Sequence, residues 1–185
     1  MKILVIAAHP DDEVLGMGGT INKYVKDGHK VKIVIMATGI FARRTNNYEN
    51  STIYSVDEKS KDLMEKQMLD LRKDAIKANK ILGVTDISFE NFPDNEMDLI
   101  SNLEITKKIE SIIYDFEPDI VYTHFKDDVN VDHRILYNAT VTATRPIPNS
   151  KVKQVITFEI PSSTEWYFPS SFSPNIFIIF VLILI

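Results

Sequence analysis

Residues 2–13 read KILVIAAHPDDE, and this stretch decides the fold. After Lys2 the run is apolar as far as Ala8, which is typical of a parallel strand that is buried on both faces. The polar cluster HPDDE follows at once. Apolar residues at helical spacing then predict a helix over 13–27 that stops at Gly28, and residues 30–38 predict a second strand.

The rest of the chain repeats this alternation of strand and helix. Strands are predicted at 86–91, 119–124 and 152–160, and helices at 58–82, 98–116 and 133–144. The residues expected to face inward on the first of these helices are Leu63, Met68, Leu71, Ala75, Ala78 and Leu82. The alternation predicts an α/β fold, Rossmann-like, with a mostly parallel sheet and helices on both faces. In such folds ligands lie beyond the C-terminal ends of the strands.

The composition excludes several classes of protein. The 185 residues are 44% hydrophobic and 25% charged, which is ordinary for a globular domain and excludes wholesale disorder. The absence of cysteine excludes a disulfide scaffold, a thiol nucleophile and a Cys-bound metal site. A net charge of −5 without a long basic run argues against nucleic acid as a partner. The N-terminal stretch lacks the features of a signal peptide, so we expect a cytoplasmic protein.

The last ten residues, 176–185, read IFIIFVLILI. A membrane span needs roughly 20 apolar residues, so we expect no membrane span here. The run is either a final buried strand or an atypical tail left by a truncated or frame-altered end. We therefore expect one domain over 1–175 followed by this tail. A second subunit could cover the tail or a strand edge, which is compatible with a homo-oligomer.

Two polar clusters leave the predicted sheet at the same edge, one after the strand at 2–8 and one after the strand at 119–124. Together they hold three of the four histidines in the chain. Imidazole and carboxylate are the usual zinc ligands where cysteine is absent, and three protein ligands leave a position for water. A further carboxylate beside that position could take the proton of the water. The side chains concerned are His9, Asp11, Asp12, His124, Asp127, Asp128, Asp132 and His133.

Each of these residues also has an ordinary structural explanation. Asp11 or Asp12 could simply cap the helix that follows. His124 could be a hydrogen-bonded histidine in the sheet, and Asp127 with Asp128 is typical of a solvated turn. The joint placement of the two clusters favours a metal site over these separate explanations.

Three glycines, Gly16, Gly18 and Gly19, follow the first strand and resemble a dinucleotide-binding loop. That fingerprint places its first glycine in the tight turn, but here HPDDE occupies the turn, and its carboxylates would repel a pyrophosphate. We expect instead that the glycines let the first helix pack close to the sheet.

With these residues in view, the sequence resembles the PIG-L (LmbE-like) zinc-dependent deacetylases over roughly residues 1–175. The matching motifs are AHPDDE at 8–13, RKDAIKANKILG at 72–83, FPDN at 92–95, NVDHR at 130–134 and FEIPSSTEW at 158–166. The resemblance implies removal of an N-acetyl group from a glucosamine-containing substrate, a small-molecule amino-sugar conjugate.

The resemblance also implies roles for individual residues. It assigns the zinc ligands to His9, Asp12 and His133, the general base to Asp11, an orienting carboxylate to Asp132, and contacts with sugar hydroxyls to Arg72 and Asp94. His and carboxylate ligands accept Fe²⁺ as well as Zn²⁺. Several family members carry a histidine that stabilises the oxyanion where this chain has Asn130. An amide can also donate to an oxyanion, and His124 is the alternative donor.

The leading hypothesis is therefore a metal-dependent N-deacetylase. A carbohydrate-binding or scaffold protein that keeps the pocket without turnover is the alternative, and a phosphoesterase-like metallohydrolase is a third. Arg43 and Arg44 could reach an anionic group of the substrate or remain solvated. Trp166 and Tyr167 could stack on a sugar or belong to the core.

Overall fold

The computed structural model describes residues 1–45, 52–166, 168 and 171–179. Five strands form one sheet in the order β3-β2-β1-β4-β5, and all neighbouring strands are parallel. The strands are β1 (Lys2–Ala7), β2 (Lys30–Ala37), β3 (Asp86–Phe92), β4 (Ile120–His124) and β5 (Gln154–Phe158). The predicted α/β fold with a parallel sheet is confirmed.

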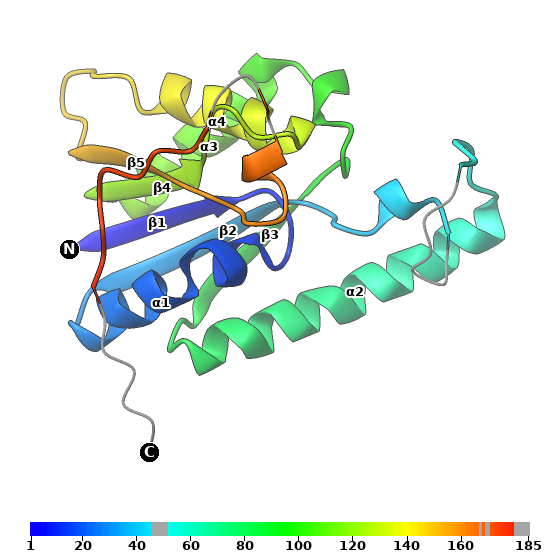
Figure 1. Cartoon of the computed structure of the whole chain (residues 1–185), viewed down its shortest axis with the longest axis horizontal. Helices are drawn as coiled ribbons and strands as arrows, with labels where there is room; N and C mark the ends of the chain where they lie inside the picture. The colour runs from blue at the N-terminus through cyan, green and yellow to red at the C-terminus, as the bar shows by residue number, and fades with distance from the viewer. Residues whose placement is uncertain (46–51, 167, 169–170, 180–185) are drawn as a thin grey trace.

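Helices cover both faces of the sheet (Figure 1). They are α1 (Asp12–Lys26), α2 (Glu58–Ile81), α3 (Asn102–Phe116) and α4 (Val131–Ala143), with short 3₁₀ turns at Phe41–Arg43, Met97–Leu99 and Thr164–Trp166. Alternate residues of β1 enter different cores, because successive side chains of a strand point to opposite faces. Ile3 and Val5 pack on the α1 side, whereas Leu4 and Ile6 pack on the α3 and α4 side.

Two helices differ from the sequence prediction. The helix expected from residue 98 begins at Asn102, because the Ser101 hydroxyl accepts a hydrogen bond from the Glu104 N–H and so caps the helix. On α2 the inward position was predicted for Leu63, but Leu63 is 42% exposed and its neighbour Met64 is fully buried. At this point the buried face of α2 therefore lies one residue further along the chain than predicted.

Gly16 brings α1 against the strand and turn that end the sheet. A Cβ at this position would lie 2.7 Å from the Glu159 carbonyl oxygen and 2.8 Å from Phe158 Cδ2. At Gly18 a Cβ would meet nothing closer than 3.9 Å. The expectation that glycines allow close packing is thus confirmed at Gly16, and Gly18 is not needed for it.

The described part of the C-terminal tail, residues 171–179, has no regular secondary structure and leaves Phe177 and Ile179 largely exposed. A buried final strand is therefore wrong for residues 176–179, and the remaining residues, 180–185, lie outside the described part. Within the described residues, no helix has both the length and the apolar character that crossing a membrane requires.

Candidate active site

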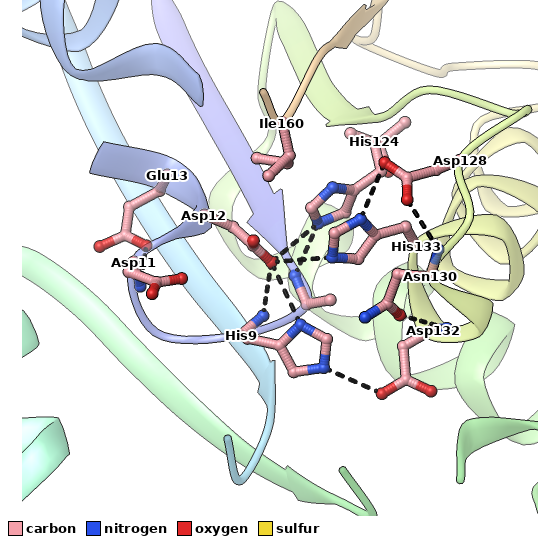
Figure 2. A network of polar contacts seen from close by, with 12 residues as sticks. His9, Asp11, Asp12, Glu13, His124, Asp128, Asn130, Asp132, His133 and Ile160 are labelled. Atoms are coloured by element: carbon pink, nitrogen blue, oxygen red, sulfur yellow. Dashed lines mark hydrogen bonds and ion pairs between the residues drawn. The ribbon is translucent and has the colours of Figure 1, made fainter. Parts of the chain in front are cut away.

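The polar clusters meet where the strand order reverses. The chain runs outward from β1 to β2 and β3, then returns to place β4 on the other side of β1. Such a reversal opens a crevice beyond the carboxyl ends of the two central strands. His9 follows β1 and His124 ends β4, while His133 lies in the first turn of α4, so the three imidazoles gather in this crevice (Figure 2).

Asp12 lies between these imidazoles, and only 4% of the residue's surface is exposed. Its Oδ2 accepts the His9 backbone N–H at 2.8 Å, and lies 3.4 Å from His9 Nδ1 and 3.2 Å from His133 Nε2. Ligand atoms of these three residues all lie within 4.8 Å of one another, close enough to share one metal ion. Among the described residues, the buried His133 Nε2 has no hydrogen-bond partner. This orphaned nitrogen and the His₂Asp donor set fit a metal ion.

The other side of His9 faces two carboxylates. His9 Nε2 lies 3.0 Å from Asp132 Oδ2 and 3.3 Å from Asp94 Oδ1. Asp132 is fixed in turn by the backbone N–H groups of Asn95 and Met97, at 2.7 and 3.1 Å. His9, Asp94 and Asp132 also have metal-ligand spacing. The set with Asp12 fits better, because the carboxylates of Asp94 and Asp132 can accept a hydrogen bond from Nε2–H and leave the Nδ1 lone pair available for the metal.

The cluster carries unusual pKa values. Burial alone would lower the pKa of His9, but hydrogen bonds to Asp12, Asp132 and Asp94 raise it well above the ordinary value. Burial would also lower the pKa of His133, but the nearby carboxylates of Asp12 and Asp128 raise it. Burial opposes ionisation of Asp12, yet the surrounding imidazoles hold its pKa well below the usual range. Raised pKa values on both histidines mean that a metal ion binding there competes with protons.

Asp11 sits beside this trio in a strained turn. It occupies the N-cap position of α1 with φ 114°, and its side chain makes no capping hydrogen bond. A non-glycine residue at such a φ costs of order 1–3 kcal/mol and is often found at functional sites. Partial desolvation and the negative charge of Asp12 raise the pKa of Asp11 to about 6. The carboxyl is exposed to the cavity and is therefore available as a base near neutral pH.

A buried pair from two helices supports this turn. Glu13 is fully buried, and its Oε2 accepts the Asp11 backbone N–H at 3.2 Å. Its Oε1 accepts a hydrogen bond of 2.6 Å from Asn79 Nδ2 on α2. Burial raises the pKa of Glu13, and the hydrogen bond from Asn79 opposes that effect. The motif residue Glu13 thus ties the strained turn to α2.

Asp127 and Asp128, expected as a solvated pair, are separated by the structure. Asp127 is half-buried and pairs with the exposed Lys126, but Asp128 is fully buried. Its Oδ2 lies 3.1 Å from His133 Nδ1 and its Oδ1 accepts the Asn130 backbone N–H at 2.8 Å. Burial would raise the pKa of Asp128, but the His133 contact and these hydrogen bonds lower it. The solvated-turn interpretation of Asp128 is therefore wrong, and only its spacing of five residues before His133 hinted at this in the sequence.

A cavity of about 330 Å³ opens onto the cluster. It is lined by His9, Asp11, Asp12 and His133, and also by Arg43, Asp94, Asn130 and the wall residues Ile160, Ser162 and Ser163. The Asp94 carboxylate accepts the Ala42 N–H at 2.9 Å. Asn130 caps α4 by accepting the Asp132 N–H, and its Nδ2 donates one hydrogen to Asn95 Oδ1. The second Nδ2 hydrogen is left over for a group in the cavity.

Two residues that were predicted to contact the substrate, Arg72 and His124, are not among the described residues that line this cavity. The Arg72 guanidinium donates to the Glu90 carbonyl and the Asn91 side chain. His124 is fully buried behind His133, with ring centroids 3.8 Å apart, and its Nε2 accepts the Ala8 N–H at 2.8 Å. Burial and the neighbouring imidazoles lower the pKa of His124 to about 3. His124 is therefore a neutral, buried histidine at the end of β4.

The remaining aromatic and basic candidates lie elsewhere. Arg44 pairs with Glu96 and stacks on Tyr54 beside a neighbouring hollow of about 300 Å³. Trp166 is 59% exposed, so it does not belong to the core. Tyr167 lies outside the described residues.

Comparison with known proteins agrees with this geometry. The sequence model of the PIG-L family, described as GlcNAc-PI de-N-acetylase, matches residues 4–144. This chain belongs to the PIG-L family. The chain is also 32% identical over 180 residues to the uncharacterized deacetylase YaiS of Escherichia coli K12, covering 95% of this chain and 80% of that protein.

Solved structures extend the comparison to the fold of this PIG-L chain. An N,N′-diacetylchitobiose deacetylase from Pyrococcus horikoshii is 28% identical with a TM-score of 0.61, over 81% of this chain and 52% of that one. A deacetylase of the teicoplanin biosynthesis pathway has a TM-score of 0.72 at 22% identity, over 94% and 73% of the two chains. The chain thus spans about half the length of the Pyrococcus enzyme, and the second likeness concerns the fold alone.

Proposed function

We propose that this chain is a metal-dependent hydrolase that removes the N-acetyl group from a GlcNAc-type sugar conjugate. The observation that carries the proposal is the convergence of His9, Asp12 and His133 around one position, with the strained Asp11 beside them on the cavity wall. Membership of a deacetylase family supports the same reaction.

In this proposal His9 Nδ1, an Asp12 carboxylate oxygen and His133 Nε2 hold Zn²⁺, and Fe²⁺ fits the same donors. The bound ion supplies a Lewis acid that polarises the acetamide carbonyl and lowers the pKa of water. Asp11 accepts a proton from the attacking water and gives it to the leaving nitrogen as the C–N bond breaks. Water and amide are thereby converted into acetate and a free amino sugar.

The other cavity residues have supporting roles. Asp132 accepts a hydrogen bond from His9 Nε2–H and so orients that ring, while the second Nδ2 hydrogen of Asn130 donates to the developing oxyanion. Asp94 and Arg43 face the cavity, where they can bind hydroxyl or anionic groups of the substrate. The positions of Arg72 and His124 favour a structural role for both.

The test combines metal content with turnover. We expect about one zinc or iron ion per chain after purification, lost in His133→Ala, and acetate release from a set of N-acetylglucosamine conjugates. Asp11→Ala should keep the metal but lower kcat by about 10²–10⁴-fold, the usual contribution of a general base. Unchanged turnover in Asp11→Ala would contradict the mechanism. A wild type that binds metal but hydrolyses no conjugate would favour the alternative, a carbohydrate-binding protein.

A further inference from the structure

Asp128 connects three parts of the molecule that the sequence keeps apart. It lies in the loop between β4 and α4, contacts His133 in the first turn of α4, and also receives hydrogen bonds from the segment after β5. In that segment Thr164 Oγ1 donates to Asp128 Oδ2 at 2.8 Å and Ser163 Oγ donates at 3.0 Å. One buried carboxylate thus joins a candidate metal ligand to the wall of the cavity.

The contact with His133 has a specific chemical consequence. A neutral imidazole carries its proton on one nitrogen only, and the other nitrogen then offers a lone pair. Carboxylates face both nitrogens, because Asp128 Oδ2 lies 3.1 Å from His133 Nδ1 and Asp12 Oδ2 lies 3.2 Å from Nε2. Asp12 Oδ2 also accepts the His9 backbone N–H and is itself a proposed metal ligand, whereas Asp128 lies away from the proposed metal position, so the arrangement compatible with a bound ion puts the proton on Nδ1. The lone pair is then on Nε2, which faces Asp12 and is the nitrogen without a hydrogen-bond partner among the described residues.

We propose that Asp128 is a positioning residue that fixes the Nδ1–H tautomer of His133 and thereby presents Nε2 to the metal. The inference rests on the proposed function, because it takes His133 as a ligand. The sequence placed Asp128 near the predicted cluster, but neither the sequence nor the family resemblance gave it a role toward His133. Replacing a carboxylate that hydrogen-bonds to a metal-ligating histidine commonly weakens metal binding by about 10–100-fold.

The neighbouring residue provides a matched control. Asp128→Asn keeps the size of the side chain, but an amide Nδ2 facing His133 Nδ1 would donate to it and favour the Nε2–H tautomer. Asp127→Asn makes the same chemical change one residue away, where the half-buried carboxylate pairs with Lys126. Ser163→Ala removes the 3.0 Å hydrogen bond to Asp128 and a longer contact of 3.5 Å between Ser163 Oγ and His133 Nδ1, but it keeps the Asp128 carboxylate that faces His133.

The tautomer can be measured without metal. Long-range ¹H–¹⁵N NMR of the metal-free full chain, at a pH where His133 is neutral, distinguishes the two nitrogens, and His133→Ala identifies the signals. We expect Nδ1–H in the wild type, Asp127→Asn and Ser163→Ala, and Nε2–H in Asp128→Asn. An Nε2–H tautomer in the wild type, or an unchanged tautomer in Asp128→Asn, would overturn the proposal.

Zinc affinity, measured by competition with a chromophoric chelator, gives the second readout. We expect a 10–100-fold weaker Kd in Asp128→Asn and less than about threefold change in Asp127→Asn and Ser163→Ala. An equal loss of zinc affinity in Ser163→Ala would show that Asp128 acts by holding the segment after β5 in place and not by fixing the tautomer of His133, which contradicts the proposal. A wild type with the Nδ1–H tautomer that binds no zinc would instead refute the metal site of the proposed function and leave the tautomer assignment supported.

Discussion

Replacing Gly16 by alanine tests whether α1 must approach β5 as closely as the structure shows. The added Cβ would lie 2.7 Å from the Glu159 carbonyl oxygen, 2.8 Å from Phe158 Cδ2 and 3.0 Å from Ile160 Cδ1. Contacts under 3 Å with a backbone oxygen cannot be relieved by a side-chain rotation alone. The helix or the turn after β5 has to shift by several tenths of an ångström.

The matched variant is Gly18→Ala, two residues further along the same helix. Its Cβ would be 3.9 Å from Leu82 and Val14, an ordinary contact. Both variants gain about 1 kcal/mol of helix propensity, so this gain cancels in the comparison. Overpacking costs typically about 1–3 kcal/mol and applies only at Gly16. Gly16→Ala should therefore be less stable than Gly18→Ala by about 1–3 kcal/mol.

Thermal unfolding of the two variants, followed by circular dichroism, measures this difference. At this chain length 1 kcal/mol corresponds to roughly 2–4 °C in Tm, so we expect a separation of several degrees. Since α1 begins at Asp12, one turn before Gly16, the shift should also weaken zinc binding in Gly16→Ala alone. Equal Tm values for the two variants would refute the reasoning, because they would show that the close approach carries no cost.

Three further predictions concern the site. Zinc affinity should rise with pH, because the raised pKa values of His9 and His133 extend to higher pH the range in which zinc must displace protons from these imidazoles. Each displaced proton contributes up to about tenfold per pH unit, and a chelator competition series from pH 6 to 8 measures the slope; a flat series contradicts the prediction. Asp11→Gly should abolish hydrolysis, because it removes the proposed base. It should also raise the free energy of unfolding, measured in urea, by about 1 kcal/mol, since glycine adopts φ 114° without strain. A lower free energy of unfolding would argue against strain at this turn. Asn79→Ala should lower the free energy of unfolding by about 1.5–3 kcal/mol, because it removes a hydrogen bond to the buried Glu13 carboxyl. Urea titration measures the change, and Lys80→Ala at the neighbouring exposed position is the control. Equal effects of the two substitutions would contradict a stabilising role for the Glu13–Asn79 hydrogen bond.

The alternation of apolar runs and amphipathic segments was sufficient to predict the parallel α/β fold. That prediction succeeds because buried parallel strands such as β1 need apolar residues on both faces, which leaves a local signal in the sequence. Helix boundaries and faces were less certain. Ser101 and Glu104 carried a capping signal that would have placed the start of α3 correctly, whereas the exposure of Leu63 depends on what lies beside α2.

The same distinction applies to the candidate site. Sequence motifs singled out His9, Asp12 and His133, and the structure brings their ligand atoms within 4.8 Å of one another. The pair Asp127 and Asp128 shows the limit of that reasoning. The two carboxylates are equivalent in sequence, but Asp127 is half-buried beside Lys126 and Asp128 is fully buried against His133.

What the sequence determined by itself is the succession of strands and helices and the chemical types at the strand ends, because propensity, periodicity and motif spacing are local properties. The tertiary structure alone decided which nitrogen of each imidazole faces Asp12, that His124 is buried behind His133, and that the segment after β5 reaches Asp128. Two of these contacts, between Asp12 and His133 and between Asp128 and Thr164, join residues more than 30 positions apart in the chain. They exist only because the reversal of strand order places β1 beside β4 and β4 beside β5.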